Sequence, residues 1–426
     1  MKIRKYFFTI LFILMCVFSN AQDKTLKEQA LDEFKNEHYD NAIALMEKAK
    51  KENPNDAEVY FYLGWFNHYR AYDSRPLQGY DFSYSKKIFD YFDKALELNP
   101  NFNNAKYFYG VECSANAFEA MKNYDAKKIK YFYQKAYEKG AFPAWLVEIG
   151  KNMLNSCDKN AILFTGGNAD FDICMYLQNC QDFRKDITII SLGVIDRPWL
   201  IKFYKNGLKN SVRKINLNLT DKQILDLHPF KWKSTEIKID VSDNLKREFN
   251  LPENYQMQWT VEPDLSEKRS LVKIESEESD GTRPLLSPQR AMLLQIVEDN
   301  FKERPIYFCG AEESFYGGLD KYFQYCGFTY RLLPFETENT DYKVNIEKLE
   351  TICKKENLEN YSDILKNDIQ RITIQYNYFP VFYRLSEFYK NTNQKEKLQK
   401  LIDLYKEKLF IGFNKEAEEY WLEKIR

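Results

Sequence analysis

Apolar residues recur with helical spacing through the first third of the chain, after a short apolar opening segment. Small residues such as Ala49 and Gly64 would let two helices approach closely, and prolines such as Pro54 would end one helix before the next begins. The recurring positions are Ala42, Met46, Ala49 and Pro54, then Tyr60, Leu63, Gly64, Ile88, Phe92, Ala95 and Pro100, then Tyr109, Gly110, Ile129, Tyr133 and Ala136. This pattern predicts a solenoid of paired helices over residues 22–150.

The pattern changes near residue 160, where short apolar runs begin to alternate with amphipathic stretches. The predicted strands are Ala161–Thr165, Ile187–Leu192, Arg304–Cys309 and Phe328–Phe335. The predicted helices are Asp172–Cys180, Pro198–Asn206 and Pro288–Asn300, the last with Ser287 as its N-cap. This alternation predicts a Rossmann-like α/β domain with a mostly parallel sheet over residues 155–340.

A strand-rich insertion is predicted within that domain, over residues 211–282. Apolar and polar residues alternate there in three runs, as they do in antiparallel strands with one buried face: Thr235–Val241, Met257–Val261 and Leu271–Ile274.

Helical spacing returns after residue 340. Val381–Tyr389 and Lys395–Leu409 are amphipathic, and Tyr378–Pro380 is predicted to mark the start of the first of these helices. Residues 341–426 are therefore predicted to form helical pairs in the style of the first part of the chain.

The segment Ala71–Ser85 is too long for a turn between two repeats, and it is rich in Tyr, Asp and Ser. It predicts an exposed loop. The loop is either a tolerated surface insertion or a contact to a partner, with Tyr72, Tyr80 and Tyr84 as its anchors.

The opening segment has the layout of a secretory signal peptide. Lys2, Arg4 and Lys5 precede the apolar run Tyr6–Phe18, and small or polar residues lead to Ala21. The apolar run is short of the roughly 20 residues that a membrane span needs, although an uncleaved membrane anchor is the alternative. We expect cleavage of residues 1–21, export, and a mature chain that is periplasmic or associated with the outer membrane but does not span a membrane.

Lipid attachment at Cys16 is a further possibility for the opening segment. Met15 precedes it where lipoprotein processing usually needs a small residue, so cleavage after Ala21 is favoured.

The charge balance narrows the class of partner. The chain has 62 Lys and Arg against 63 Asp and Glu, a formal net charge of −1. Residues 1–21 hold three of the cations and no acid, so their removal would give −1 − 3 = −4. A balance of this kind predicts no nucleic-acid partner. The expected partners are a protein, bound by the helical repeats, and a glycan or small molecule.

The cysteines give no sign of a metal site. Besides Cys16 there are Cys113, Cys157, Cys174, Cys180, Cys309, Cys326 and Cys353. Their number is odd and no two have CxxC spacing, which argues against a zinc site or a disulfide framework. We predict no metal and no cofactor, and we assign no disulfide pairing.

Polar loops follow three of the predicted strands and make the candidate ligand rim. In a largely parallel sheet the carboxyl ends of the strands lie at one edge, where ligands bind. The residues of this rim are Gly166, Gly167, Asn168, Asp170, Asp196, Arg197, Glu312 and Glu313. Its acids could hold a hard cation or act as acid and base. The alternative is that Asp170 and Asp172 cap the helix that follows and that the other acids are solvated.

Several familiar catalytic patterns are missing from the sequence. Gly166-Gly167 lacks the GxGxxG pattern and the lysine of a phosphate-binding loop. The histidines are His38, His68 and His228, and no Ser-His-Asp set can be assembled from them. Catalytic residues therefore stay unassigned.

The helical part resembles the tetratricopeptide repeat family over residues 25–145, and the run ALELNP at Ala95–Pro100 is the most specific piece of the resemblance. The resemblance implies that these helices bind a peptide or another protein. With so few repeats they could instead brace the domain behind them.

The α/β part resembles the extracytoplasmic C-terminal region of large Bacteroidetes membrane proteins described as protein O-mannosyltransferase-like. Three blocks carry the resemblance, which covers residues 155–340: Ile162–Gln178, Arg184–Lys205 and Glu303–Pro334. The first block of that family reads F-T-N-G-D-N-D-T-F. This chain keeps Phe164, Thr165, Gly167 and Asp170 but has Asn168 and Ala169 in place of the Asp-Asn pair.

The resemblance implies an accessory soluble domain of the cell envelope, because sugar transfer in that family belongs to its membrane half. Two hypotheses follow. The chain is an exported binding or scaffold protein, which would make it no enzyme, or it is an enzyme of envelope glycan or glycoprotein metabolism that uses Asp170 with Asp196 or Glu312. A purely structural brace is a third reading.

Overall fold

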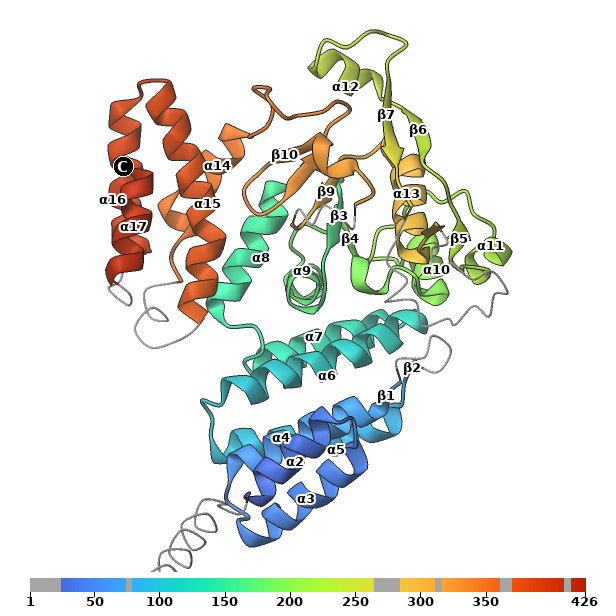
Figure 1. The fold of residues 1–426 in the computed structure, drawn as a ribbon, viewed down its shortest axis with the longest axis vertical. Helices are drawn as coiled ribbons and strands as arrows, with labels where there is room; N and C mark the ends of the chain where they lie inside the picture. Colours follow the sequence, from blue (N-terminus) through green and yellow to red (C-terminus); the bar gives the residue numbers. More distant parts are fainter. Residues whose placement is uncertain (1–23, 74–78, 264–283, 311–315, 361–369, 410–414) are drawn as a thin grey trace, which may run out of the picture. The chain divides into compact units, whose positions relative to one another are not determined.

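The computed structural model describes residues 24–73, 79–263, 284–310, 316–360, 370–409 and 415–426 (Figure 1). The predicted signal peptide, residues 1–21, and the predicted strand Leu271–Ile274 lie outside these ranges. The chain divides into two compact units, Met1–Glu112 and Cys113–Arg426. Within the described ranges, no helix combines the length and the apolar character that crossing a membrane requires.

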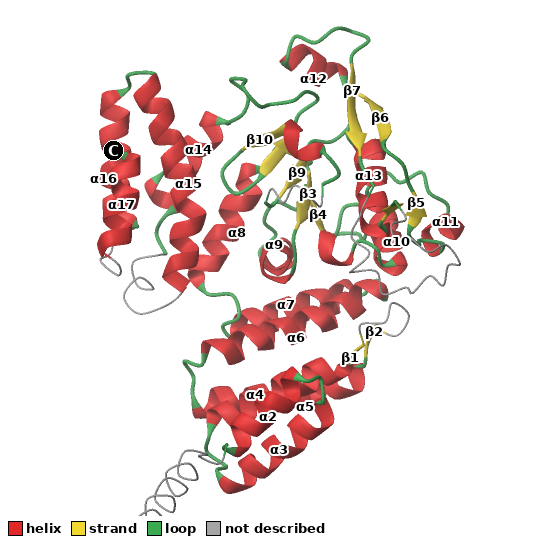
Figure 2. Cartoon of the chain, in the orientation of Figure 1, coloured by secondary structure: helices red, strands yellow, loops and turns green. Residues whose placement is uncertain are grey.

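Paired helices make up the first unit, as predicted (Figure 2). They are α2 (Leu26–Lys35), α3 (Tyr39–Glu52), α4 (Ala57–Ala71), α5 (Ser85–Leu98) and the first part of α6 (Asn103–Lys122). Helix α2 packs against α3, and α4 packs against both α3 and α5. The start of α2 is fixed by Thr25, whose hydroxyl accepts from the Glu28 N–H at 3.2 Å.

The core of this unit depends on small residues at the helix contacts. Ala30, Ala42 and Leu63 are fully buried. Gly64 on α4 lies against the ring of Phe92 on α5, and a Cβ atom at Gly64 would lie 2.5 Å from that ring. Glycine is therefore required where these two helices meet.

We expect Gly64→Ala to lower the free energy of unfolding by about 1–3 kcal/mol, the usual cost of overpacking a well-filled core. Urea denaturation followed by circular dichroism measures the change. Gly167→Ala is the matched control, because a Cβ there would meet no atom within 4 Å. Equal stability of the two variants would contradict this account of the α4–α5 contact.

The insertion between α4 and α5 is partly built into the unit, which corrects the expectation of a wholly exposed loop. Strand β1 (Tyr72–Asp73) pairs antiparallel with β2 (Gly79–Tyr80), and a short 3-10 helix, η1 (Phe82–Tyr84), follows. The Tyr80 hydroxyl donates to the buried carboxylate of Glu112, which also accepts from Ser85 at 2.6 Å. His68 Nδ1 lies 2.8 Å from the same carboxylate. Tyr80 therefore anchors the insertion to its own unit, so its hydroxyl is not left for a partner.

The second unit begins with helices, continues with the sheet and ends with helices. Its helices are the remainder of α6, α7 (Ala126–Glu138), α8 (Ala144–Ser156), α9 (Asn168–Cys180), α10 (Pro198–Asn206), α11 (Asp221–Leu225), α12 (Asp243–Glu248), α13 (Pro288–Asn300), α14 (Ile346–Ile352), α15 (Gln370–Asn391), α16 (Lys395–Lys408) and α17 (Lys415–Ile425). Its strands are β3 (Ile162–Thr165), β4 (Thr188–Ser191), β5 (Phe230–Lys231), β6 (Thr235–Asp240), β7 (Gln256–Val261), β8 (Leu285–Leu286), β9 (Ile306–Phe308), β10 (Phe323–Tyr325) and β11 (Tyr330–Leu332). Short 3-10 helices are η2 (Leu192–Val194), η4 (Leu319–Tyr322) and η5 (Lys355–Asn357).

The main sheet has the strand order β10-β11-β9-β3-β4. Strand β3 is parallel to both of its neighbours, with Ile162 opposite Thr188 on β4 and Ile306 on β9. The pairs β9–β11 and β11–β10 are antiparallel. The sheet is therefore mixed, which corrects the prediction of a mostly parallel one, although the predicted parallel pairs are present.

A tight turn between β10 and β11 causes the reversal. Gly327 has a φ of +94°, a conformation that residues with side chains rarely adopt. The Cys326 N–H donates to the Thr329 carbonyl at 2.8 Å across the turn. A connection this short can join only antiparallel strands, because a parallel pair needs a long crossover. The predicted strand Phe328–Phe335 contains β11, whereas β10 was not predicted.

The inserted strands predicted near residues 235 and 260 are confirmed. Strands β6 and β7 form an antiparallel ladder in which Ile237 faces Trp259 and Ile239 faces Met257. Side chains alternate between exposed and buried along β7. The alternation of apolar and polar residues in the sequence therefore correctly predicted a strand with one buried face. Strands β5 and β8 form a second small antiparallel pair.

The C-terminal helices are confirmed, but the predicted start of the first is wrong. Helix α15 runs through Tyr378–Pro380 without a break, with Pro380 in its interior. Proline removes one helical N–H bond and usually ends a helix. Here Val381, Phe382 and Leu385 on the same helix are buried, so packing maintains the helix across the proline.

A buried arginine holds the amino ends of the parallel strands together. Arg304, directly before β9, donates to the carbonyls of Asn160 and Ala161 at 2.9 and 2.8 Å. It also donates to the Thr188 hydroxyl at 2.8 Å and to the Lys214 carbonyl at 3.1 Å. One guanidinium thus binds main-chain carbonyls at the start of β3 and in the loop after α10, and a side-chain hydroxyl at the start of β4.

A buried carboxyl joins α9 to the helices that precede the sheet. Asp172 Oδ1 accepts from Ser114 Oγ at 2.6 Å and from the Tyr133 hydroxyl at 3.2 Å. Asp172 is 4% exposed, and burial raises the pKa of its carboxyl to about 7 although both hydroxyls act in the opposite direction. It does not cap α9, which corrects that part of the alternative given for this residue.

We expect the stability of the protein to fall as the pH rises from about 4 to 7, because the pKa of Asp172 is higher in the folded state than in the unfolded chain. Asp172→Asn keeps an oxygen for both hydroxyls and should remove this part of the pH dependence. Above pH 7 the variant should be more stable than the parent by on the order of a few kcal/mol.

Urea denaturation at a series of pH values checks the Asp172 prediction. Asp90→Asn, which changes an exposed carboxylate on α5, is the control and should leave the slope in place. A parent protein whose stability is constant between pH 4 and 7 would show that Asp172 is ionised in the fold.

Candidate functional site

The glycine loop after β3 is held by the carboxylate of Asp170. Asp170 Oδ2 accepts from the Gly166 N–H at 2.7 Å, and Oδ1 accepts from the Gly167 N–H at 3.0 Å. Asp170 therefore caps the start of its own helix, α9, which agrees with the alternative proposed for this residue. Asn168 is the first residue of α9.

The structure brings the loops after β3 and β4 into contact. A Cβ atom at Gly193, in η2, would lie 3.4 Å from the Gly166 carbonyl oxygen. Because β9 is also parallel to β3, the loop after it leaves from the same edge of the sheet. There Gly310 has a φ of +96°, and its carbonyl accepts from the Tyr316 hydroxyl at 3.0 Å. Glu312 and Glu313, the predicted acids of this third loop, lie outside the described residues.

Asp196 and Arg197 form the polar part of the second loop. Burial raises the pKa of the Asp196 carboxyl, against the opposing charge of Arg197. Arg197 Nε lies 3.9 Å from Asp196 Oδ1, which makes this a weak ion pair. In the described structure no hydrogen bond or ion pair links Asp170 with Asp196. The two carboxylates thus have separate environments and no direct bond.

Sulfur atoms lie beneath the rim. Met153 Sδ on α8 is 3.2 Å from Cys309 Sγ at the end of β9 and 3.7 Å from Cys174 Sγ on α9. Burial raises the pKa of both thiols well above the usual value, so they are neutral and unreactive near pH 7. The cysteines of the described chain are all free.

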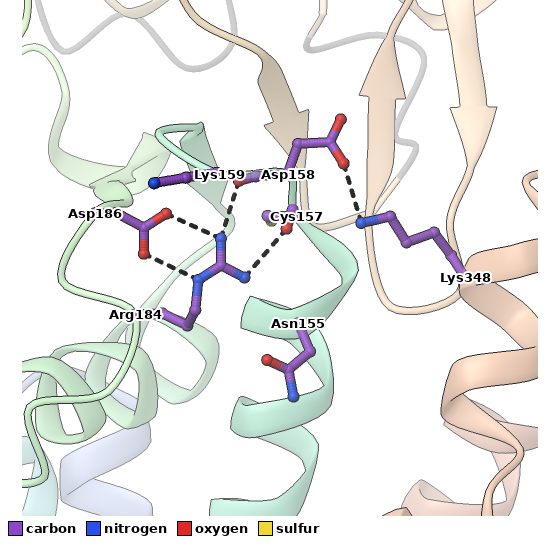
Figure 3. A pocket seen from close by; sticks show the side chains of 7 residues that line it. All are labelled: Asn155, Cys157, Asp158, Lys159, Arg184, Asp186 and Lys348. Carbon is purple, nitrogen blue, oxygen red and sulfur yellow. Dashed lines mark hydrogen bonds and ion pairs between the residues drawn. The ribbon is translucent and has the colours of Figure 1, made fainter.

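A hollow of about 540 Å³ lies away from the rim, near the amino ends of β3 and β4 (Figure 3). It is lined by Asn155, Cys157, Asp158, Lys159, Arg184, Asp186 and Lys348. Sequence reasoning did not find this hollow, because its residues come from α8, from the loops before two strands and from α14. The charged residues directly before the predicted strands were the only available signal.

Arg184 is the centre of this hollow, and its hydrogen bonds are directed at the protein itself. It donates to the carbonyls of Leu154, Cys157 and Asp158 at 2.7, 3.1 and 2.9 Å. It also holds the Asp186 carboxylate at 2.9 and 3.0 Å, which lowers the pKa of that carboxyl to about 2. Figure 3 shows the guanidinium bonded to the Asp186 carboxylate and to the carbonyls of Cys157 and Asp158. Arg184 therefore fixes the loops and has little capacity left for a ligand.

The other charges of the hollow are partly paired. Lys348 Nζ lies 3.0 Å from Asp158 Oδ1, and Arg331 Nε lies 3.5 Å from the other oxygen of the same carboxylate. These cations lower the pKa of Asp158 despite its burial. Lys159 is exposed and makes no ion pair with the described residues. The hollow is thus a polar recess in which, among the described residues, Lys159 is a lining cation without an ion pair.

Metal ligands do not gather in the described residues. No group of three or more His, Cys, Asp or Glu side chains in these ranges has the arrangement of a metal site. Asp170, the rim acid best placed to be a ligand, uses both oxygens on main-chain N–H groups.

Residues 146–279 and 266–351 match one family model. It describes TMEM260-associated domain 2. TMEM260 is an O-mannosyltransferase-like protein, so the resemblance is confirmed for residues 146–351 only as one to a domain associated with such a protein. The finer resemblance to the extracytoplasmic region of Bacteroidetes membrane proteins stays a prediction. No tetratricopeptide repeat model matches the chain, and that resemblance stays a prediction. No curated protein matches the chain.

The TMEM260-associated domain contains both features described above. It extends from α8 to α14 and includes the glycine loops, Asp196 and the hollow around Arg184. Helices α2–α7 and α15–α17 lie outside the matched residues.

We expect Asp170→Ala to lower the free energy of unfolding by about 1 kcal/mol, because two N–H groups at the start of α9 lose their acceptor. Asp170→Asn retains one acceptor oxygen and should lower the free energy of unfolding by less. Asp196→Ala is the control, since its ion pair with Arg197 is 3.9 Å long. Thermal unfolding of the three variants measures the difference, and an Asp170→Ala protein as stable as the parent would contradict the capping role of Asp170.

Proposed function

We propose that this chain is an exported binding or scaffold protein of the cell envelope. Its N-terminal helix pairs engage a protein partner, and its TMEM260-associated domain acts as an accessory domain with a glycan or small-molecule ligand. The observation that carries the proposal is a set of aromatic side chains shared by three helices of the first unit.

This aromatic strip consists of Phe34 on α2, Trp65 and Tyr69 on α4, and Tyr107 and Phe108 on α6. The Trp65 ring lies 4.8 Å from Phe34, 5.4 Å from Phe108 and 5.9 Å from Tyr69, measured between ring centroids. Tyr69 and Tyr107 are 41% and 50% exposed. The strip therefore has a packed centre and two exposed rings.

Such a surface suits a protein ligand. Tyrosine and tryptophan contribute large contact areas at low conformational cost, and they are enriched at the energetic centres of protein interfaces. The rings come from α2, α4 and the part of α6 that belongs to the first unit, and stacked helical repeats use such extended surfaces for binding. The same aromatic residues also pack between the helices, so their presence alone does not distinguish binding from packing. Capture of a partner protein is therefore the property to be measured.

Features of the first unit support a tetratricopeptide-like arrangement. Helices α2 and α3, then α4 and α5, form consecutive pairs. Gly64 permits the close approach of the second pair, and Pro54 and Pro100 follow α3 and α5. In the second unit, the parallel strands β4, β3 and β9 support a Rossmann-like domain. Export is proposed from residues 1–21 alone.

An enzyme of envelope glycan or glycoprotein metabolism is the second candidate, and one observation favours it. Asp196 is partly buried next to glycine loops, and its raised pKa suits a general acid. A proton donor needs a second group at the same site, and the predicted partners Glu312 and Glu313 lie outside the described residues.

We expect a photo-crosslinking residue at Tyr107 to capture a defined protein in the native envelope. The same group placed at Tyr131 on α7, which is 56% exposed, is the control and should capture that protein far less. Mass spectrometry identifies the captured protein in the adduct, and the N-terminus of the present chain in that adduct should be Gln22.

Variants make the crosslinking result specific. Tyr69→Ala combined with Tyr107→Ala should reduce co-purification of the captured protein at least tenfold, whereas Tyr72→Ala tests the insertion instead. Equal capture from Tyr107 and Tyr131, or full retention by the double variant, would contradict the strip as the binding surface. Loss of a sugar-processing activity in Asp196→Ala would instead favour the enzyme.

A further inference from the structure

A second hollow, of about 660 Å³, is lined by basic residues and by no acid. It is formed by the loop that follows α10, residues 207–214, together with Lys185 and Asn206. Its cations are Lys185, Lys209, Arg213 and Lys214. This loop is separate from the rim and from the hollow around Arg184, and no property was assigned to it from the sequence.

Three of these cations have no counterion in the described structure. Lys185 Nζ lies 2.7 Å from Asp182, whereas Lys209, Arg213 and Lys214 are exposed and make no ion pair with any described residue. The buried guanidinium of Arg304 adds further positive charge. Its pKa is lowered to about 10, first by burial and then by the charge of Arg213, with only a weaker opposing effect of Asp186. The hollow is therefore a concentrated region of positive potential.

The main chain of the loop is fixed, so the cations do not depend on one another for their position. Leu208 and Val212 form a bridge, with N–H to carbonyl distances of 2.8 and 2.9 Å in the two directions. Ser211 Oγ donates to the buried side chain of Asn179 at 2.5 Å. Gly207 has a φ of +69°, and a Cβ there would lie 2.8 Å from the Lys214 nitrogen, so the two ends of the loop meet only because residue 207 is glycine.

The main-chain carbonyls of Arg213 and Lys214 are hydrogen-bonded to residues of the sheet region. The Arg213 carbonyl accepts from the Thr188 hydroxyl at 3.0 Å, and the Lys214 carbonyl accepts from Arg304 at 3.1 Å. Like charges on one short loop repel each other, and an anion bound among them would relieve that repulsion. Because the main chain of the loop is already ordered, less conformational entropy is lost when the anion binds.

We propose that this loop, residues 207–214, is a binding site for a phosphate-bearing ligand. Phosphate carries close to two negative charges near pH 7 and accepts several charge-assisted hydrogen bonds, which suits a hollow lined by one arginine and three lysines. A carboxylate carries one charge and would leave most of these cations unpaired. The phosphate group belongs either to a free phosphorylated molecule or to a lipid headgroup.

The test uses the full chain and inorganic phosphate, followed by calorimetric titration at low salt. The variant Lys209→Gln/Arg213→Gln/Lys214→Gln should bind phosphate at least tenfold more weakly. The control Lys354→Gln/Lys400→Gln/Lys406→Gln removes the same charge from exposed lysines of the second unit that make no ion pair with a described residue, and it should change binding less than twofold. Arg213→Lys, which keeps the charge and loses the fork, should show an intermediate affinity.

Further probes identify the source of the phosphate. A lipid headgroup would be assigned if the protein sediments with vesicles of phosphatidic acid but not with vesicles of phosphatidylcholine. The loop variant should then no longer sediment with the phosphatidic acid vesicles. Phosphate binding without vesicle binding would assign a free ligand.

Other results would overturn the phosphate site. They are phosphate affinity unchanged in the loop variant, equal loss in the loop and control variants, or acetate binding as tight as that of phosphate. Thermal unfolding of each variant shows that the fold is retained, which we expect because the altered side chains are exposed and the main-chain bonds of the loop remain.

Discussion

Two arginines at the amino ends of the parallel strands are the constraint on which the second unit depends. Arg304 and Arg184 give most of their hydrogen bonds to main-chain carbonyls of the segments that enter β3 and leave α8. A carbonyl at a strand end that is buried and unpaired would cost about 1–3 kcal/mol. By satisfying several such groups at once, each guanidinium fixes the register in which the strands start, and the glycine loops at their other ends follow from that register.

The two ends of the parallel strands carry different kinds of polar group. At the carboxyl ends, main-chain N–H groups and one capping carboxylate dominate, with Asp170 bound to Gly166 and Gly167. At the amino ends, cations dominate, and both hollows are found there. A search for function restricted to the carboxyl ends, which is the general rule for parallel sheets, misses this second set of side chains.

Local chemistry explains which elements could be predicted. Helices α10 and α13 span the residues that the sequence indicated, and their starts carry strong local signals: proline at the first position of both, and a serine cap on α13. The parallel strands were predictable from short apolar runs. Strand β10 could not be predicted, because three residues are too few to show a pattern. Without β10, the turn at Gly327 and the reversal of strand direction could not be predicted either.

The site was less predictable than the fold, because it depends on contacts between distant segments. The environment of Asp172 is set by Ser114 and Tyr133, and that of Glu112 by His68 and Tyr80, none of them near in sequence. Helical spacing predicted that Tyr133 is buried but not which polar group it meets. Pro380 shows the opposite case, where a clear local signal was overruled by the burial of its neighbours on α15.

The burial of the cysteines has a consequence for the chain before it is folded. In the native protein, burial raises the pKa of Cys326 to about 12 and that of Cys180 to about 11, and it also raises the pKa of Cys174 and Cys309 near Met153. In the unfolded chain the same groups return to a pKa of about 8.5, where a few per cent are thiolate at neutral pH. Oxidation of the thiols therefore competes with folding only while the chain is unfolded. A chain that folds slowly accumulates mispaired cysteines, whereas the buried thiols of the folded chain resist oxidation.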